Sequence, residues 1–482
     1  MKRQVADRSE VAGNDVAQVA IVAGVATALA FLVVGPVFQL QTYGDGAIFS
    51  WAVALGEGWD IHWRNIAPRA SAYVLQLRPA ELAGAWTQSP RVAIAAYGIL
   101  LAAPQALGLA ATFVFDRTRQ RVFFVFACAS TACLAPLVFG FPSEMLLAHA
   151  LFWPTLALAT CAGRTRRAAL MVFGFMLATA FTHEAALGLL AGIVGVQWLR
   201  GAGHPAFLRA LACFVAVVAV WLAVNRAIPP DAYYGEVRLR AASEFLEARS
   251  LAFPEARLLA SALAAYFALA LCLRPFTARA GALAALATLA GLGLFWWRFD
   301  TILHAESRYY ARTILLAGTC ILAVVAALIF LRSEGRAGRI EKLGAPALDA
   351  LSRAGWIFPG ALAVLLVVHV VETTKFVRGW LDYRAAVRAL ALGEAADPQL
   401  GAPFFVSSAR IAPDVDRLSW FSTTPYFSAL VADFAPNRIV VDPKGNYFWM
   451  DCGMATRQAE KPGAVPRRTR EMIAAYACAH RP

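Results

Sequence analysis

The run VAIVAGVATALAFLVVGPVF occupies residues Val19–Phe38, and Thr27 is the one polar side chain in it. About 20 apolar residues in an α-helix cross the roughly 30 Å hydrocarbon core of a bilayer. The run is longer than the apolar core of a signal peptide, and no small-residue cleavage site follows it. We therefore predict that it is a retained membrane-spanning helix.

The composition of the whole chain is that of a helical membrane protein. Of the 482 residues, 60% are hydrophobic and 16% are charged, whereas soluble proteins carry about 25% charged residues. Because the backbone must satisfy its own hydrogen bonds in lipid, repeated apolar runs predict an all-α polytopic membrane protein. We predict eleven spans, at Val19–Phe38, Val92–Phe115, Val122–Phe139, Met145–Ala162, Ala168–Phe181, Ala185–Leu199, Ala206–Val224, Leu258–Leu273, Ala280–Trp297, Thr313–Leu331 and Trp356–Val371.

The fifth and sixth spans, Ala168–Phe181 and Ala185–Leu199, are short for a bilayer. As one tilted helix, they would reverse the sidedness of every later segment. As a hairpin, with the N-terminus in the cytoplasm, they give inner segments more than twice the Lys and Arg density of the outer loops. Charge placement therefore favours the hairpin.

Residues 1–371 are predicted to form the membrane domain, with outer loops at 41–91, 226–257 and 298–312. The net charge of +13 lies mostly in the inner segments, so we predict membrane lipid and no nucleic acid as a partner. Arginine far outnumbers lysine, which favours a GC-rich bacterial genome. We predict the inner membrane of a bacterium, with residues 372–482 as a periplasmic C-terminal domain.

The C-terminal residues have a mixed pattern that predicts a small α/β domain. Thr374–Leu392 is typical of an amphipathic helix, and Phe404–Ser407 and Arg438–Asp442 of short strands. Cys452 and Cys478 are the two cysteines outside the predicted spans. In an oxidising periplasm they would form a disulfide.

Directly after the first apolar run, residues Thr42–Ser50 read TYGDGAIFS. The pKa of a carboxyl group at the water–lipid boundary can be tuned by burial and by neighbouring charges for proton abstraction. Asp45 is therefore a candidate general base. The alternative is a turn or helix-cap residue.

Other outer turns also carry ionisable side chains. Glu57, Asp60 and His62 in the first loop are typical of a solvated face, whereas polar groups at membrane depth usually have a function. Glu144, and the pair His183 and Glu184 at the tip of the predicted hairpin, could instead be helix caps. The candidate substrate-binding residues are Glu144, His183, Glu184, His304, Glu306 and Tyr309.

Arg308 and Arg312 are spaced i, i+4 beside two tyrosines. Such residues can anchor a helix at the interface, or their guanidinium groups can bind the phosphate of a lipid carrier. No His-x-x-x-His or Cys-x-x-Cys spacing indicates a metal site, so the cofactor is left open. A divalent cation held by Glu144, His183 and Glu184 is one candidate.

With these residues in view, the chain resembles the GT-C superfamily of integral membrane glycosyltransferases, which includes protein O-mannosyltransferases and oligosaccharyltransferases. The resemblance rests on Asp45 as the first-loop acid, the interfacial segment Ala67–Trp86, and Arg308 with Arg312. It implies transfer of a polyprenyl-phosphate-linked sugar to an envelope acceptor at the periplasmic face. Many members have adjacent acids in that loop, whereas Gly46 follows Asp45 here.

Two other classes of function stay open. A transporter or flippase would place polar groups near mid-membrane, where Pro104, Gln105 and Pro154 are the mild interruptions of the predicted spans. A non-catalytic assembly protein could use the aromatic stretch Trp420–Tyr426 as a binding surface, although core packing also explains it.

Overall fold

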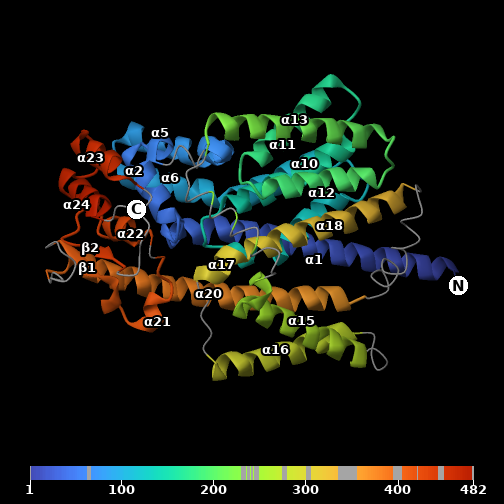
Figure 1. Ribbon diagram of the computed structural model, residues 1–482. Helices are drawn as coiled ribbons and strands as arrows, with labels where there is room; N and C mark the ends of the chain where they lie inside the picture. Colours follow the sequence, from blue (N-terminus) through green and yellow to red (C-terminus); the bar gives the residue numbers. More distant parts are fainter. Residues whose placement is uncertain are drawn as a thin grey trace.

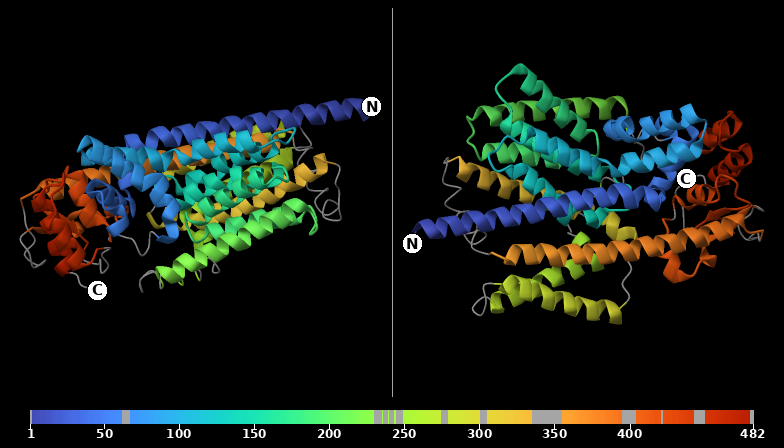
Figure 2. Two further views of the ribbon diagram at one scale, coloured as in Figure 1. Left: turned by 90° about the horizontal axis from the view of Figure 1, so that it is seen from above. Right: turned by 180° about the vertical axis from the view of Figure 1, so that it is seen from behind.

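The computed structural model describes residues 2–61, 67–229, 235, 239, 243, 249–273, 279–299, 305–334, 355–394, 404–420, 422–442 and 450–479. Long helices run side by side along one axis. The N-terminus lies at one end and the C-terminal helices and strands gather at the other (Figures 1 and 2). The helices are α1 (Lys2–Val37), α2 (Gly46–Leu55), α4 (Ala70–Ala72), α5 (Arg78–Thr87), α6 (Pro90–Ala102), α7 (Pro104–Phe115), α8 (Val122–Cys133), α9 (Ala135–Val138), α10 (Glu144–Cys161), α11 (Arg166–Ala180), α12 (Ala186–Trp198), α13 (Pro205–Ala227), α15 (Pro254–Leu273), α16 (Ala280–Arg298), α17 (Ala305–Tyr310), α18 (Arg312–Ser333), α20 (Ile357–Leu392), α21 (Pro413–Asp416), α22 (Thr424–Val431), α23 (Cys452–Glu460) and α24 (Arg467–Ala479).

The fold is helical, and several of its helices can cross a membrane. Within the described residues, seven are long and apolar enough: α1, α10, α13, α15, α16, α18 and α20. The pair α6 and α7 is bent by 41° and adds one more if it forms a single span. The predicted count of eleven is therefore not confirmed. Val122–Val138 contains Pro136 and a break at Leu134, and α11 and α12 have 15 and 13 residues.

The core of the bundle is centred on α10, which packs against α7, α8, α11 and α12 and is almost entirely buried. Its polar side chains bond within the bundle. His149 Nε2 lies 2.7 Å from Ser130 Oγ, and His149 Nδ1 lies 3.1 Å from Gln105 Oε1. Gln105 Nε2 in turn donates to the carbonyl of Leu146 at 2.8 Å. These contacts join α7, α8 and α10 where apolar packing alone would leave polar atoms unsatisfied.

The first outer loop is largely helical. After α2, the chain continues through η2 (Ala67–Arg69), α4, a π-helical turn η3 (Tyr73–Leu77) and α5. The predicted interfacial segment Ala67–Trp86 is thus helical, and it exposes the apolar side chains of Val74, Leu75, Leu82 and Trp86. Such a surface is typical of a segment that lies in the membrane interface.

The C-terminal region begins inside α20, which runs for 36 residues without a break across residue 371. The predicted span Trp356–Val371 and the predicted helix Thr374–Leu392 are therefore one helix. Beyond it, β1 (Phe405–Ser407) pairs in parallel with β2 (Ile439–Val441), with Phe405 opposite Ile439. A separate domain at 372–482 stays a prediction.

The described C-terminal residues pack on α2 and are closed by a disulfide. The Trp51 ring on α2 lies 6.1 Å from that of Tyr426 and 6.2 Å from that of Phe434, centroid to centroid. Cys452 and Cys478, at the start of α23 and near the end of α24, are joined by a disulfide bond. The C-terminal residues are thus held beside the first loop.

Candidate functional site

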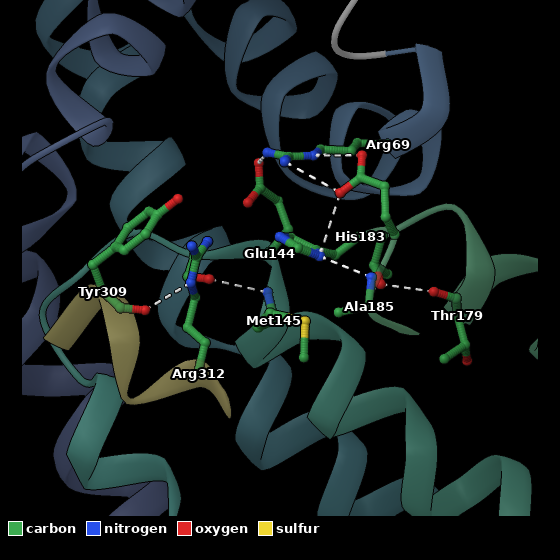
Figure 3. A network of polar contacts seen from close by, with 11 residues as sticks. Arg69, Glu144, Met145, Thr179, His183, Ala185, Tyr309 and Arg312 are labelled. Carbon is green, nitrogen blue, oxygen red and sulfur yellow. Dashed lines mark hydrogen bonds and ion pairs between the residues drawn. The ribbon is translucent and has the colours of Figure 1, made fainter. Parts of the chain in front are cut away.

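Segments far apart in the sequence meet at the end of the bundle that carries the C-terminal residues. Figure 3 shows residues of η2, the start of α10, the α11–α12 turn and the α17–α18 junction close together. The α1–α2 turn belongs to the same group, because the charges of Arg312, Glu144 and Arg69 act on Asp45. The α11–α12 turn and the loop are in direct contact, because Ser71 N donates to the carbonyl of Phe181 at 3.0 Å. The two short helices therefore form a hairpin whose tip lies against the first loop.

Arg69 holds this meeting point together. Its Nη1 lies 3.0 Å from Glu144 Oε1, and its Nη2 lies 3.3 Å from Glu184 Oε2. Arg69 Nε also donates to Glu184 Oε1 at 3.4 Å. Because the planar guanidinium forms a fork that fits a carboxylate, one arginine links the loop to both α10 and the hairpin tip.

His183 at the hairpin tip is neutral near pH 7. Its Nδ1 accepts from Ala185 N at 3.1 Å and lies 3.4 Å from Glu184 Oε2. Burial lowers the pKa of His183 to about 4; Glu184 opposes this shift, and Arg69 and Arg312 add to it. Because Nδ1 accepts a hydrogen bond, the ring proton is on Nε2. His183 can therefore donate one hydrogen bond to a substrate oxygen.

Asp45 precedes α2, but its side chain makes no capping hydrogen bond to that helix. Its Oδ1 instead accepts from Trp420 Nε1 at 2.9 Å. Burial raises the pKa of Asp45 to about 6, an effect opposed by the charges of Arg312 and Arg69 and reinforced by that of Glu144. Asp45 is thus close in space to the other charged groups of the site, and its carboxyl group is a stronger base than an exposed one.

The glycines on each side of Asp45 are required by the local geometry. Gly44 has a φ of +54°, and a Cβ there would meet the Phe141 ring at 2.8 Å. A Cβ at Gly46 would collide with the Gln41 carbonyl and the Pro142 ring. The Gly-Asp-Gly sequence therefore lets the chain turn tightly against the 139–143 segment.

An aromatic wall adjoins Asp45. The Trp420 ring lies 5.5 Å from the Tyr309 ring and 5.4 Å from the Phe141 ring, centroid to centroid. Arg312 Cζ lies 3.6 Å from the centroid of Tyr309, and Arg312 Nε donates to the Tyr309 carbonyl at 2.8 Å. The site thus combines a carboxylate, aromatic faces and a cation.

Arg308 does not join Arg312 at this site. Ala311, whose backbone is in the right-handed helical region, separates α17 from α18. Arg308 is buried, with its guanidinium 3.9 Å from the centroid of Phe376 and its Nη1 donating to the carbonyls of Phe139 and Pro136. The predicted binding of a carrier phosphate by Arg308 and Arg312 stays a prediction.

The other ionisable residues singled out from the sequence lie away from this site or outside the described residues. His304, His62 and the side chain of Glu306 lie outside the described residues. Glu57 Oε1 lies 2.8 Å from Lys461 Nζ, so this residue of the predicted solvated face contacts the C-terminal region. His149 belongs to the buried network of the bundle and is separate from the site.

A divalent cation has no prepared position among the described residues, where no group of three or more His, Cys, Asp and Glu side chains could hold a metal ion. The guanidinium of Arg69 already lies between the carboxylates of Glu144 and Glu184. These two acids are therefore neutralised by a side chain of the protein.

Two site residues were missed by the sequence analysis. Arg69 lies in the interfacial segment Ala67–Trp86, to which the sequence assigned no role in the site. Trp420 is about 375 residues from Asp45 in the chain, and its indole donates to that carboxylate. The aromatic stretch Trp420–Tyr426 was the available signal, but nothing in the sequence gives its partner.

Searches against protein-family models, curated proteins and solved structures found no match to this chain.

Proposed function

We propose that this protein is a membrane glycosyltransferase that moves a sugar from a polyprenyl-phosphate carrier to an acceptor hydroxyl. The observation that carries the proposal is Asp45, whose carboxyl pKa is about 6, held by Trp420 beside an aromatic wall and Arg312. A base with a pKa slightly below the working pH is mostly ionised and still accepts protons well.

In the proposed reaction, Asp45 takes the proton of the acceptor hydroxyl. The acceptor oxygen attacks the anomeric carbon of the sugar, and the bond from that carbon to the carrier phosphate breaks. The electron pair leaves with the phosphate, and the proton ends on Asp45. Because Oδ1 of Asp45 already accepts a hydrogen bond from Trp420 Nε1, Oδ2 of Asp45 is the oxygen that accepts the proton.

The other groups of the site support binding and charge stabilisation. Tyr309 and Trp420 offer faces on which a sugar ring can pack. Arg312, half-buried at the start of α18, would stabilise the charge that develops on the leaving phosphate. Glu144, His183 and Glu184, fixed around Arg69, would position sugar or acceptor hydroxyls.

We also propose eleven crossings of a bacterial inner membrane, with the site and C-terminal region on the periplasmic side. The eleven spans would be the seven long helices, the bent pair α6–α7, the pair α8–α9, and the single helices α11 and α12. These shorter helices pack against longer ones within the bundle, where protein replaces part of the lipid. The opposite placement of the two ends of the chain in Figure 1 agrees with an odd number of crossings.

The test is glycan analysis of a strain that lacks this protein. Surface lipids and glycans of the deletion strain are compared with those of its parent, and the missing product identifies sugar and acceptor. Complementation with Asp45→Asn should fail although the protein is inserted normally. The matched control is Asp414→Asn, since Asp414 is an exposed acid on α21. Normal glycans with Asp45→Asn would exclude Asp45 as the base.

A further inference from the structure

A second polar site lies at the edge of the bundle formed by α15, α16 and α20. Figure 1 shows α15 and α16 beside α20, and all three helices are in contact. Between them is a cavity of about 590 Å³ lined mainly by apolar side chains, among them Leu258, Ala262, Leu269, Leu292 and Phe295. All three helices are candidate spans, so we expect this groove to face the hydrocarbon of the membrane.

The polar end of the groove has charges of both signs. Glu255, Arg257 and Glu372 line it there. Glu255 and Glu372 also line a smaller adjoining cavity that contains Arg308. The two acids thus form the border between an apolar groove and a buried guanidinium. The four charges sum to zero.

Two of these charged groups have buried atoms without a hydrogen-bond partner among the described residues. Arg308 is 1% exposed, and its Nε and Nη2 have no partner among the described residues. The same holds for the buried Oε2 of Glu255. Buried charged atoms without partners are rare, because desolvation is not offset. Two adjoining cavities are therefore lined by the unpartnered N–H donors of Arg308 and by the unpartnered carboxylate oxygen of Glu255.

We propose that this groove binds a zwitterionic phospholipid with a primary amine in its headgroup, of the phosphatidylethanolamine type. An acyl chain fills the apolar groove, and the ammonium group lies between Glu255 and Glu372. The phosphate accepts from Nε and Nη2 of Arg308, which lie on one edge of the guanidinium and match two phosphate oxygens.

Charge favours this lipid over anionic ones. A phosphatidylglycerol or a polyprenyl phosphate would bring a negative charge to two carboxylates with no cation of its own to pair with them. The zwitterion satisfies both the buried donors and the buried acceptor. This inference does not depend on the proposed sugar transfer, because none of its residues lines the Asp45 site.

The experiment measures lipid retention by the full-length protein. Purified protein is exchanged into micelles that contain equal amounts of phosphatidylethanolamine and phosphatidylglycerol of the same acyl chains, with a trace of polyprenyl phosphate. Bound lipid is then quantified by mass spectrometry. The wild type should retain the ethanolamine lipid about tenfold over the others, as expected for hydrogen bonds between charged groups. No preference, or a preference for either anionic lipid, would overturn the proposal.

Two variants locate the binding. Glu255→Gln should reduce the preference to nearly that of the bulk mixture, whereas Glu460→Gln at an exposed position of α23 should leave it unchanged. Gly291→Leu fills the groove, since a Cβ at Gly291 meets no atom within 4 Å, and it should lower total retained lipid. Gly293→Leu is its control, because Gly293 is equally open but does not line the groove. Unchanged retention in both Glu255→Gln and Gly291→Leu would contradict the site.

Discussion

At the scale of single residues, Asp45 combines a reactive carboxylate with a cost to stability. Its pKa in the folded protein, about 6, is above the usual 3.8. The folded state therefore holds the proton more tightly than the unfolded state. The stability that Asp45 contributes is complete below about pH 3.8 and is lost as the pH rises through about 6.

Replacing Asp45 by asparagine should therefore stabilise the protein at neutral and higher pH. The amide resembles the protonated acid, so the variant should gain about 1–3 kcal/mol at about pH 8, and the gain should shrink below about pH 6. Thermal unfolding in detergent across this pH range measures it, with Asp414→Asn as the control that shows no pH-dependent gain. A loss of stability at high pH would contradict the buried, ionised state of Asp45.

Arg69 is the residue whose removal should disturb the site most. Arg69→Met leaves the carboxylates of Glu144 and Glu184 without their cation, which should lower the free energy of unfolding by up to about 4 kcal/mol. Arg91→Met breaks an exposed pair with Asp433 and should cost about 0–1 kcal/mol. Chemical denaturation measures both.

A triple variant separates this electrostatic effect from a packing effect. Adding Glu144→Gln and Glu184→Gln to Arg69→Met removes the unpaired charges, so the stability of the protein should return. Glycan formation should be lost in both the single and the triple variant. If the triple variant is as unstable as Arg69→Met, the arginine acts through its apolar stem and the ion pairs matter little.

At the scale of elements, apolar runs predicted helices well and their ends poorly. The run that ends near Val371 meets Glu372 and Lys375, which are typical of a span boundary. The helix nevertheless continues, because Glu372 accepts from Trp296 Nε1 at 2.8 Å and Trp380 Nε1 donates to the Phe38 carbonyl at 3.1 Å. Tertiary partners outweigh the local signal there. The break at Ala311 has no glycine or proline to indicate it.

The segment around Trp420 brings the C-terminal region to the site, and its effect should appear in the pH dependence of activity. The indole hydrogen bond lowers the pKa of Asp45, in opposition to burial. Trp420→Phe keeps an aromatic ring but removes that bond, so the acid limb of the pH–rate profile should move upward from about 6. Activity at the alkaline plateau should change less. A variant at an exposed tryptophan, Trp297→Phe, should leave the profile unchanged; an unmoved limb in Trp420→Phe would mean that the bond does not act on the base.

At the scale of the whole molecule, the convergence of outer turns follows from sidedness. Charge placement predicted that Asp45, Glu144 and the hairpin tip share one side of the membrane, and the structure brings these three together. The contacts between individual side chains could not be predicted from the sequence, because Arg69 and Trp420 reach Asp45 and its neighbours through tertiary packing of the loop and the C-terminal region. The side of the membrane on which a turn lies follows from charge placement along the whole chain, whereas the contacts between individual side chains depend on tertiary packing.

The proposed orientation predicts a pattern of thiol labelling in intact cells. In a chain whose exposed Cys272 is replaced by alanine, single cysteines are introduced at three exposed positions: Asp414, Arg119 and Gly203. Asp414→Cys lies at the end that carries the site, so a membrane-impermeant maleimide should label it from outside. Arg119→Cys precedes α8 and Gly203→Cys follows α12, and both should react with the maleimide only after the cells are permeabilised. Labelling of Gly203→Cys but not Arg119→Cys in intact cells would mean that α11 and α12 cross the membrane as one unit. The sidedness of every later helix would then reverse, and Arg312 could not share a face with Asp45.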